Sequence, residues 1–161
     1  KPDMPAPEVL FTIASARAYG RDATLMAEAR HQAANTGPTW LYNLAWRSPA
    51  EGGRRISPHS LDLPFVFDNV PAGERLAGPP SAETQAMAHQ MASSWIAFAR
   101  SGNPNNAAIP GWKPYDLENR ATMIFDLPSR LEADPWKEQR LFMDQFATTQ
   151  ASNGRHRGLG L

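Results

Sequence analysis

Residues 39–46 read Thr39-Trp40-Leu41-Tyr42-Asn43-Leu44-Ala45-Trp46, and they form the clearest predicted β-strand of the chain. Successive side chains of a strand point to opposite faces. One face therefore carries Trp40, Tyr42, Leu44 and Trp46, and the other carries Leu41 and Ala45. Apolar residues on both faces are typical of a strand that is covered on both sides. A chain of 161 residues offers few partners for such a strand, so we expect it to belong to a larger sheet.

A long helix is predicted over residues 82–101. Ser81 is suited to the N-cap position, and Gly102 is suited to the C-terminal stop. The apolar side chains between them recur at spacings of three and four, which indicates one buried stripe along the helix. The stripe consists of Met87, Met91, Trp95 and Phe98. A core role is the simpler interpretation of these residues than an acyl pocket.

Two further helices are expected toward the ends of the chain. The first runs over residues 22–35, with Asp22 as its N-cap and Gly37-Pro38 as its stop. The last begins at Asp134-Pro135, an N-cap followed by proline at the first helical position. Its apolar residues, expected to pack it against a core, are Trp136, Phe142, Met143 and Phe146.

Strands and helices alternate along the chain, which indicates the α/β class. Only two convincing strands are predicted, residues 39–46 and residues 121–127. A two-stranded sheet is marginally stable by itself. We therefore interpret the chain as an edge section of a bigger sheet.

The composition excludes several classes of protein. Acidic and basic residues balance at 16 each, so the chain lacks the basic excess of a nucleic-acid-binding protein. No apolar run approaches the roughly 20 residues that cross a bilayer, so no membrane span is expected. The absence of cysteine excludes disulfides, thiolate metal sites and a cysteine nucleophile. Because the chain starts without an initiator methionine or an apolar signal segment, we expect it to come from the interior of a longer protein.

Of the four histidines, only His59 has surroundings that suggest chemistry. His31, His89 and His156 are expected to be solvated surface residues, and no metal-ligand spacing is present, so neither a metal nor another cofactor is expected. His59 follows the clearest strand, and reactive groups of open α/β sheets gather beyond the carboxyl ends of the strands. A neutral imidazole there can take a proton from a serine hydroxyl and return it to a leaving group. An ordinary loop histidine is the alternative on these grounds alone.

The segment around His59 resembles the histidine motif of type-B carboxylesterases, the family of the cholinesterases and the bacterial para-nitrobenzyl esterases. That motif is a His, a small residue, a variable residue, an acidic residue and an apolar-aromatic run ending in Val-Phe. This chain has His59-Ser60-Leu61-Asp62-Leu63-Pro64-Phe65-Val66-Phe67. Many members have glycine or alanine where this chain has Ser60.

Other segments follow in the family's order. Residues 95–105 resemble the signature Trp-x-x-Phe-Ala-x-x-Gly-x-Pro-Asn, and residues 40–46 resemble the aromatic strand before the histidine. The resemblance covers about residues 11–146. It implies that residues 1–150 are the C-terminal section of an α/β-hydrolase fold, with edge strands of a mostly parallel sheet and packed helices. The glycine-rich residues 151–161 are expected to be a disordered tail.

The resemblance implies a carboxylic ester hydrolase with a serine nucleophile and His59 as the catalytic histidine. In this fold the triad follows the chain order Ser, then Asp or Glu, then His. The sequence contains no Gly-x-Ser-x-Gly, so the serine and the acid are expected on a companion N-terminal chain or segment. Asp62 either supports the site or caps the turn before Pro64. A small-molecule ester is the expected substrate. The alternative is a non-catalytic cholinesterase-like binding or adhesion domain, or an inactive fragment.

Overall fold

The computed structural model describes residues 4–146, so the expected tail at residues 151–161 lies outside the described part. The chain divides into two compact units. The sheet unit is Gly37–Ala133, and the helical unit comprises the described residues before and after it. Within residues 4–146, no helix is long and apolar enough to cross a bilayer.

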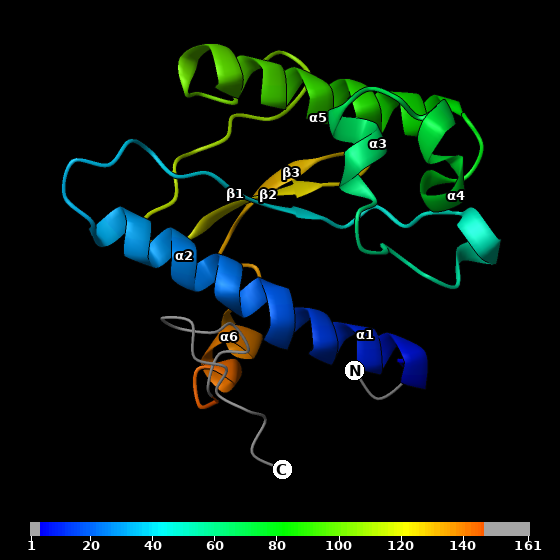
Figure 1. Ribbon diagram of the computed structural model, residues 1–161. Helices are drawn as coiled ribbons and strands as arrows, with labels where there is room; N and C mark the ends of the chain where they lie inside the picture. Colours follow the sequence, from blue (N-terminus) through cyan, green and yellow to red (C-terminus); the bar gives the residue numbers. More distant parts are fainter. Residues whose placement is uncertain (1–3, 147–161) are drawn as a thin grey trace, which may run out of the picture. The chain divides into compact units, whose positions relative to one another are not determined.

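The sheet unit contains a three-stranded mixed sheet in the order β1-β2-β3 (Figure 1). β1 (Leu41–Leu44) pairs in parallel with β2 (Ala121–Phe125), with Leu41 opposite Thr122. β2 pairs with β3 (Arg130–Ala133) in antiparallel orientation. All five residues of β2 are buried. β2 is therefore the central strand, and β1 is an edge strand of the sheet.

The two predicted strands are confirmed, although both are shorter than predicted. The backbone N–H groups of Ala45 and Trp46 both donate to the carbonyl of Phe125, at 2.9 and 3.2 Å. Two donors on one acceptor interrupt the regular ladder, so β1 ends at Leu44. β3 was not predicted, because its sequence is short and partly charged and its residues are half-buried or exposed.

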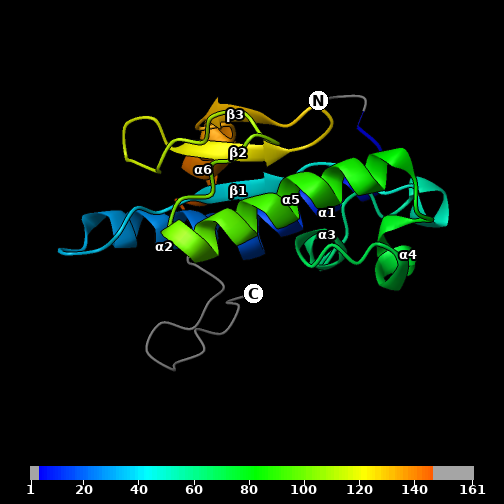
Figure 2. The ribbon, with the colours of Figure 1, turned by 90° about the horizontal axis from the view of Figure 1, so that it is seen from above.

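The helix α5 (Ala82–Ser101) covers the sheet and has the predicted bounds (Figures 1 and 2). Ser81 and Thr84 form a reciprocal capping box at its start. Gly102, with φ 72°, ends the helix in the left-handed conformation that glycine adopts without steric cost. The start and the end of α5 are thus determined by local sequence.

The core of the sheet unit lies between α5, the sheet and the short helix α3 (Asp62–Val66). Its largest buried side chains are Trp46, Leu61, Phe65, Met87, Met91, Trp112, Met123 and Phe125. The predicted stripe of α5 is only partly correct, because Phe98 is 47% exposed while Met87 and Met91 are fully buried. The predicted grouping of Trp40, Tyr42, Leu44 and Trp46 on one face of the strand is confirmed, since all four belong to this core or pack against it.

Short helical segments complete the sheet unit. The turn η2 (Ala50–Gly53) follows β1, and η3 (Pro71–Gly73) and α4 (Glu74–Ala77) follow α3. Ser48 Oγ donates to the carbonyl of Leu76, so the segment after β1 is attached to α4.

The helical unit begins with α1 (Ala6–Ser15), a π-helical turn η1 (Ala16–Gly20) and α2 (Arg21–Gln32). The helix predicted over residues 22–35 corresponds to α2. The predicted N-cap role of Asp22 is wrong, because Asp22 lies within a helical run that starts at Ala6. Pro7 occupies the first helical turn, where the missing N–H breaks no intrahelical bond. Proline there is compatible with a helix.

The last helix, α6 (Lys137–Met143), starts later than the predicted Asp134-Pro135. The Asp134 side chain is bound by Arg140, with Nη2–Oδ2 at 2.6 Å and Nε–Oδ1 at 3.2 Å. Asp134 itself has a φ of 43°, outside the helical region. The expected core roles of Trp136 and Phe142 are wrong, because these side chains are 40% and 55% exposed.

Candidate active site

His59 lies in the turn between β1 and α3, on the segment that leaves the carboxyl end of β1. This segment is attached to the strand by a side chain just before the histidine. Ser57 Oγ donates to the carbonyl of Leu44, the last residue of β1, at 3.0 Å. His59 therefore follows, by two residues, the side chain that is bonded to the end of β1.

The backbone around His59 is tightly turned. Ile56 and Ser60 have φ angles of 61° and 67°, in the left-handed region that favours glycine. The N–H of Leu61 donates to the carbonyl of Pro58 at 3.1 Å and closes a turn across His59. Conformations of this kind persist only where the surrounding structure holds them, and they gather at functional sites.

The side chains after the histidine anchor this turn in the core. Leu61 is 1% exposed and Phe65 is fully buried, with the Phe65 ring 5.4 Å from the ring of Trp46 in an edge-to-face arrangement. His59 itself is exposed. The turn therefore presents an imidazole at the surface of the sheet unit while its neighbours fix the backbone.

Asp62, the first residue of α3, points its carboxylate at the sheet. Its Oδ2 accepts a hydrogen bond from the hydroxyl of Tyr42, with an O···O distance of 3.1 Å. The N-cap position of α3 is Leu61, and no side chain caps it. The contact of Asp62 with β1 is therefore the observed role of its carboxylate.

The sequence placed Tyr42 on the strand face that also carries Trp40, Leu44 and Trp46, but not in the site. Burial, the charge of Asp62 and the hydrogen bond to Asp62 raise the pKa of Tyr42 well above its ordinary value. The phenol thus stays protonated and remains a donor at neutral pH. The signal that could have revealed this role of Tyr42 is its hydroxyl group, which lies on a strand face that is otherwise apolar.

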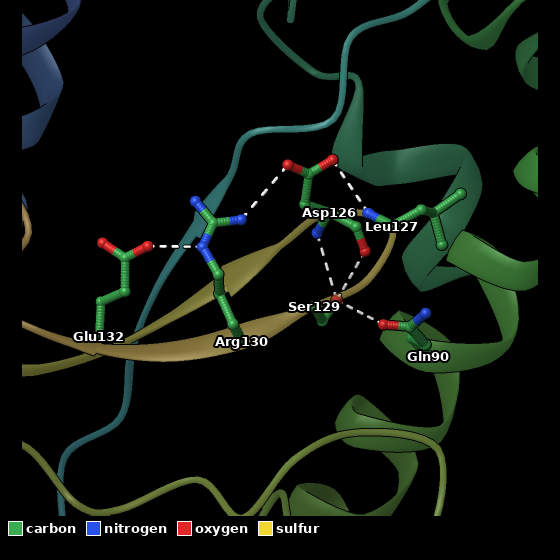
Figure 3. A network of polar contacts seen from close by, with 6 residues as sticks. All are labelled: Gln90, Asp126, Leu127, Ser129, Arg130 and Glu132. Carbon is green, nitrogen blue, oxygen red and sulfur yellow. Dashed lines mark hydrogen bonds and ion pairs between the residues drawn. The ribbon is translucent and has the colours of Figure 1, made fainter.

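Ser129, a buried hydroxyl of the sheet unit, is engaged in a structural network (Figure 3). Its hydroxyl contacts the side-chain oxygen of Gln90 on α5 and the carbonyl of Asp126, and it accepts from the Asp126 N–H. Arg130 in turn contacts the carboxylates of Asp126 and Glu132. Ser129 therefore attaches the β2–β3 turn to α5.

The remaining histidines do not extend the site. His31 and His89 are exposed on α2 and α5, as predicted, and His156 lies outside the described part of the chain. Across residues 4–146, no group of three or more His, Asp or Glu side chains is arranged to hold a metal ion.

Comparisons with known proteins identify relatives of this chain. The family model described as "Carboxylesterase family" matches residues 15–143. The para-nitrobenzyl esterase of Bacillus subtilis is 36% identical over 123 residues, which cover 76% of this chain and 24% of that protein. The cocaine esterase of Homo sapiens is 32% identical over 83 residues, which cover 52% of this chain and 13% of that protein.

Solved structures give the same result. A carboxylesterase of Geobacillus stearothermophilus matches with a TM-score of 0.71 and 30% identity, covering 88% of this chain and 29% of that one. A para-nitrobenzyl esterase matches with a TM-score of 0.69 and 30% identity, covering 84% and 27%. The fold is that of a part of an α/β-hydrolase. The chain belongs to the carboxylesterase family. It spans about a quarter of the length of the para-nitrobenzyl esterases that it matches.

Proposed function

We propose that this chain supplies the general base, His59, of a carboxylic ester hydrolase that works through a serine acyl-enzyme. The observation that carries the proposal is the exposed imidazole of His59 beyond the carboxyl end of β1, on a turn that a hydrogen bond attaches to this strand. Membership of the carboxylesterase family supports the ester as substrate class. The chain has no Gly-x-Ser-x-Gly, so the serine and the acid belong to a companion segment.

The proposed chemistry proceeds in two half-reactions. The serine Oγ bonds to the ester carbonyl carbon while His59 Nε2 takes the hydroxyl proton, and the same proton then passes to the departing alkoxide as the C–O bond breaks. A water molecule repeats the sequence on the acyl-enzyme and releases the carboxylic acid. The acid of the companion segment orients the imidazole through Nδ1.

The companion segment is part of the same proposal. β1 is an edge strand in the described sheet, and its residues are only half-buried although they are mostly apolar. An open, apolar strand edge pairs readily with another strand. A neighbouring strand from the companion would continue the sheet and bring the serine toward His59.

The test is His59→Gln in a complete esterase that contains this chain, obtained as a full-length polypeptide or by co-expression with the companion segment. We expect kcat/KM for a nitrophenyl ester to fall by at least about a thousandfold, because loss of one triad member disables the proton transfer. His89→Gln, an exposed histidine on α5, is the matched control and should keep full activity. Near-normal turnover by His59→Gln would refute the assignment.

A second experiment separates catalysis from the alternative of a non-catalytic binding domain. A fluorophosphonate probe should label a serine of the companion and none of this chain. When the companion segment is co-expressed as a separate polypeptide, intact-mass spectrometry should show the label on that polypeptide and none on the 17.7 kDa chain. Complete absence of labelling in the assembled protein would support an adhesion or binding domain instead.

A further inference from the structure

Tyr42 connects the core of the sheet unit with the helix that follows His59. Its ring lies 5.0 Å from the ring of Trp95 and 5.9 Å from that of Phe125, edge-to-face in both cases. Such pairs fix the orientation of an aromatic side chain. With the ring held on two sides, the hydroxyl is directed to one place, Asp62 Oδ2.

His59 is thereby enclosed between two attachments to the same strand. Two residues before it, Ser57 bonds the carbonyl of Leu44. Three residues after it, Asp62 bonds the hydroxyl of Tyr42. Both partners belong to β1. A turn attached to one strand on either side of a residue cannot shift relative to that strand without breaking one of the two bonds.

We propose that Tyr42 is a positioning residue for His59, acting through the carboxylate of Asp62. The inference rests on the proposed function of His59 and adds a residue that sets where the imidazole stands. The hydrogen bond has an ionised acceptor, and such bonds are about twice as strong as neutral ones. The raised pKa of Tyr42 keeps this donor protonated over the working pH range of an esterase.

Removing the Tyr42 hydroxyl should therefore reduce turnover more than substrate binding. Tyr42→Phe preserves the ring packing against Trp95 and Phe125 and deletes only the donor. A misplacement of about 1 Å can lower a rate by about a hundredfold. We expect kcat in the complete esterase to fall by about 10- to 100-fold with little change in KM, since His59 acts on the reacting atoms.

The partner variants test whether the two residues act as one unit. Asp62→Ala should resemble Tyr42→Phe, and the double variant should be no worse than either single variant, because each change breaks the same bond. Asp62→Asn keeps an acceptor oxygen. We therefore expect this variant to keep most of the activity that Asp62→Ala loses. If the fold reductions in kcat of the two single variants multiply in the double variant, the proposal is wrong.

A destabilised control separates positioning from general loss of structure. Ile124→Val removes one methylene from buried β2 and should lower the free energy of unfolding by about 0.5–1.5 kcal/mol. Ile124 is not part of the hydrophobic cluster against which Tyr42 packs, so kcat should stay normal. If Tyr42→Phe lowers kcat no more than Ile124→Val, Tyr42 has no positioning role.

His59→Gln, measured beside these variants, keeps the two proposals apart. Activity retained in His59→Gln would remove the proposed function itself. Loss of activity in His59→Gln, with normal kcat in Tyr42→Phe and Asp62→Ala, would remove only the positioning role. Should a variant assemble poorly, the His59 ring signals in an NMR spectrum of the chain provide a second readout. They should broaden or double in Tyr42→Phe, and an unchanged spectrum would contradict the proposal.

Discussion

Gly73 and Pro64 approach each other so closely that a β-carbon on Gly73 would lie 2.2 Å from the Cβ of Pro64. Real Cβ atoms do not come that near to another carbon, so only glycine fits beside this proline. Pro64 lies in α3, and Gly73 ends η3. The missing side chain of Gly73 thus lets the η3 backbone lie directly against the helix that carries Asp62.

Gly73→Ala should destabilise the chain by about 1–3 kcal/mol, because the added methyl group has to push α3 or η3 aside. Urea unfolding of the chain measures the change. Gly111→Ala is the matched control, since nothing lies within 4 Å of its β-carbon position. It should be neutral or stabilise by up to about 1 kcal/mol. Equal effects at the two sites would show that the close approach to Pro64 is unimportant.

Ser60→Gly should stabilise the turn at His59. A side chain at the left-handed φ of 67° costs about 1–2 kcal/mol, and the greater freedom of glycine in the unfolded chain offsets part of the relief. We expect a net gain of about 0.5–1 kcal/mol in the free energy of unfolding. Ser93→Gly, in the interior of α5, should have the opposite sign because glycine weakens helices. A loss of stability at both serines would contradict the strain at Ser60.

Tyr42 should make stability fall at alkaline pH. Above its ordinary pKa of 10.0 the unfolded chain releases the phenolic proton, while the raised pKa retains it in the folded state. The folded state then binds more protons, so the free energy of unfolding decreases as pH rises, by at most about 1.4 kcal/mol per pH unit. Below pH 10 this contribution is fully present.

Tyr42→Phe isolates that contribution. The other tyrosines, Tyr19 and Tyr115, are present in both proteins and cancel in the difference. Urea unfolding between pH 8 and about pH 11 should show the stability difference between the chain and Tyr42→Phe shrinking above pH 10. A difference that stays constant over the whole range would mean that the Tyr42 pKa is not raised.

Asn105 should matter for stability through its two bonds to the backbone of Trp112. Its Oδ1 accepts from the Trp112 N–H at 2.6 Å, and its Nδ2 donates to the Trp112 carbonyl at 2.8 Å. Trp112 is 5% exposed, so Asn105→Ala leaves backbone groups of a buried residue unsatisfied and should destabilise by about 1–3 kcal/mol.

Two companion variants check this role of Asn105. Asn105→Asp keeps the acceptor and loses the donor, so it should fall between the wild type and Asn105→Ala. Asn69→Ala removes only a 3.4 Å contact to the N–H of Ala72 at an exposed site and should change stability by less than about 0.5 kcal/mol. Thermal unfolding followed by tryptophan fluorescence measures the stability of all three variants. If Asn105→Ala leaves stability unchanged, the two bonds to the Trp112 backbone do not stabilise the chain.

The parts of the fold that sequence predicted are those with local causes. α5 was predicted with its bounds because Ser81 and Gly102 act on the helix ends directly. The aromatic face of β1 was predicted because alternation is a property of any strand. α1 was not predicted, although the proline in its first turn is compatible with a helix.

The site was predictable only in part, for a similar reason. The position of His59 after a strand follows from the order of residues along the chain. The bond between Tyr42 and Asp62 does not, because it depends on how α3 packs against the sheet. The left-handed conformation of Ser60 was not predicted, because serine at that position gives no sign of a positive φ in the sequence.

The parallel pairing of β1 with β2 determines when during synthesis the histidine turn can take its final form. Leu41 finds its partner Thr122 only after α5 and everything between them has been made. Contacts between residues so far apart in sequence form slowly, because a long loop must close first. On the ribosome, β1 and the turn that carries His59 would have no pairing strand until β2 emerges. A nascent chain stopped before Ala121 should therefore contain His59 in a segment that has not yet folded.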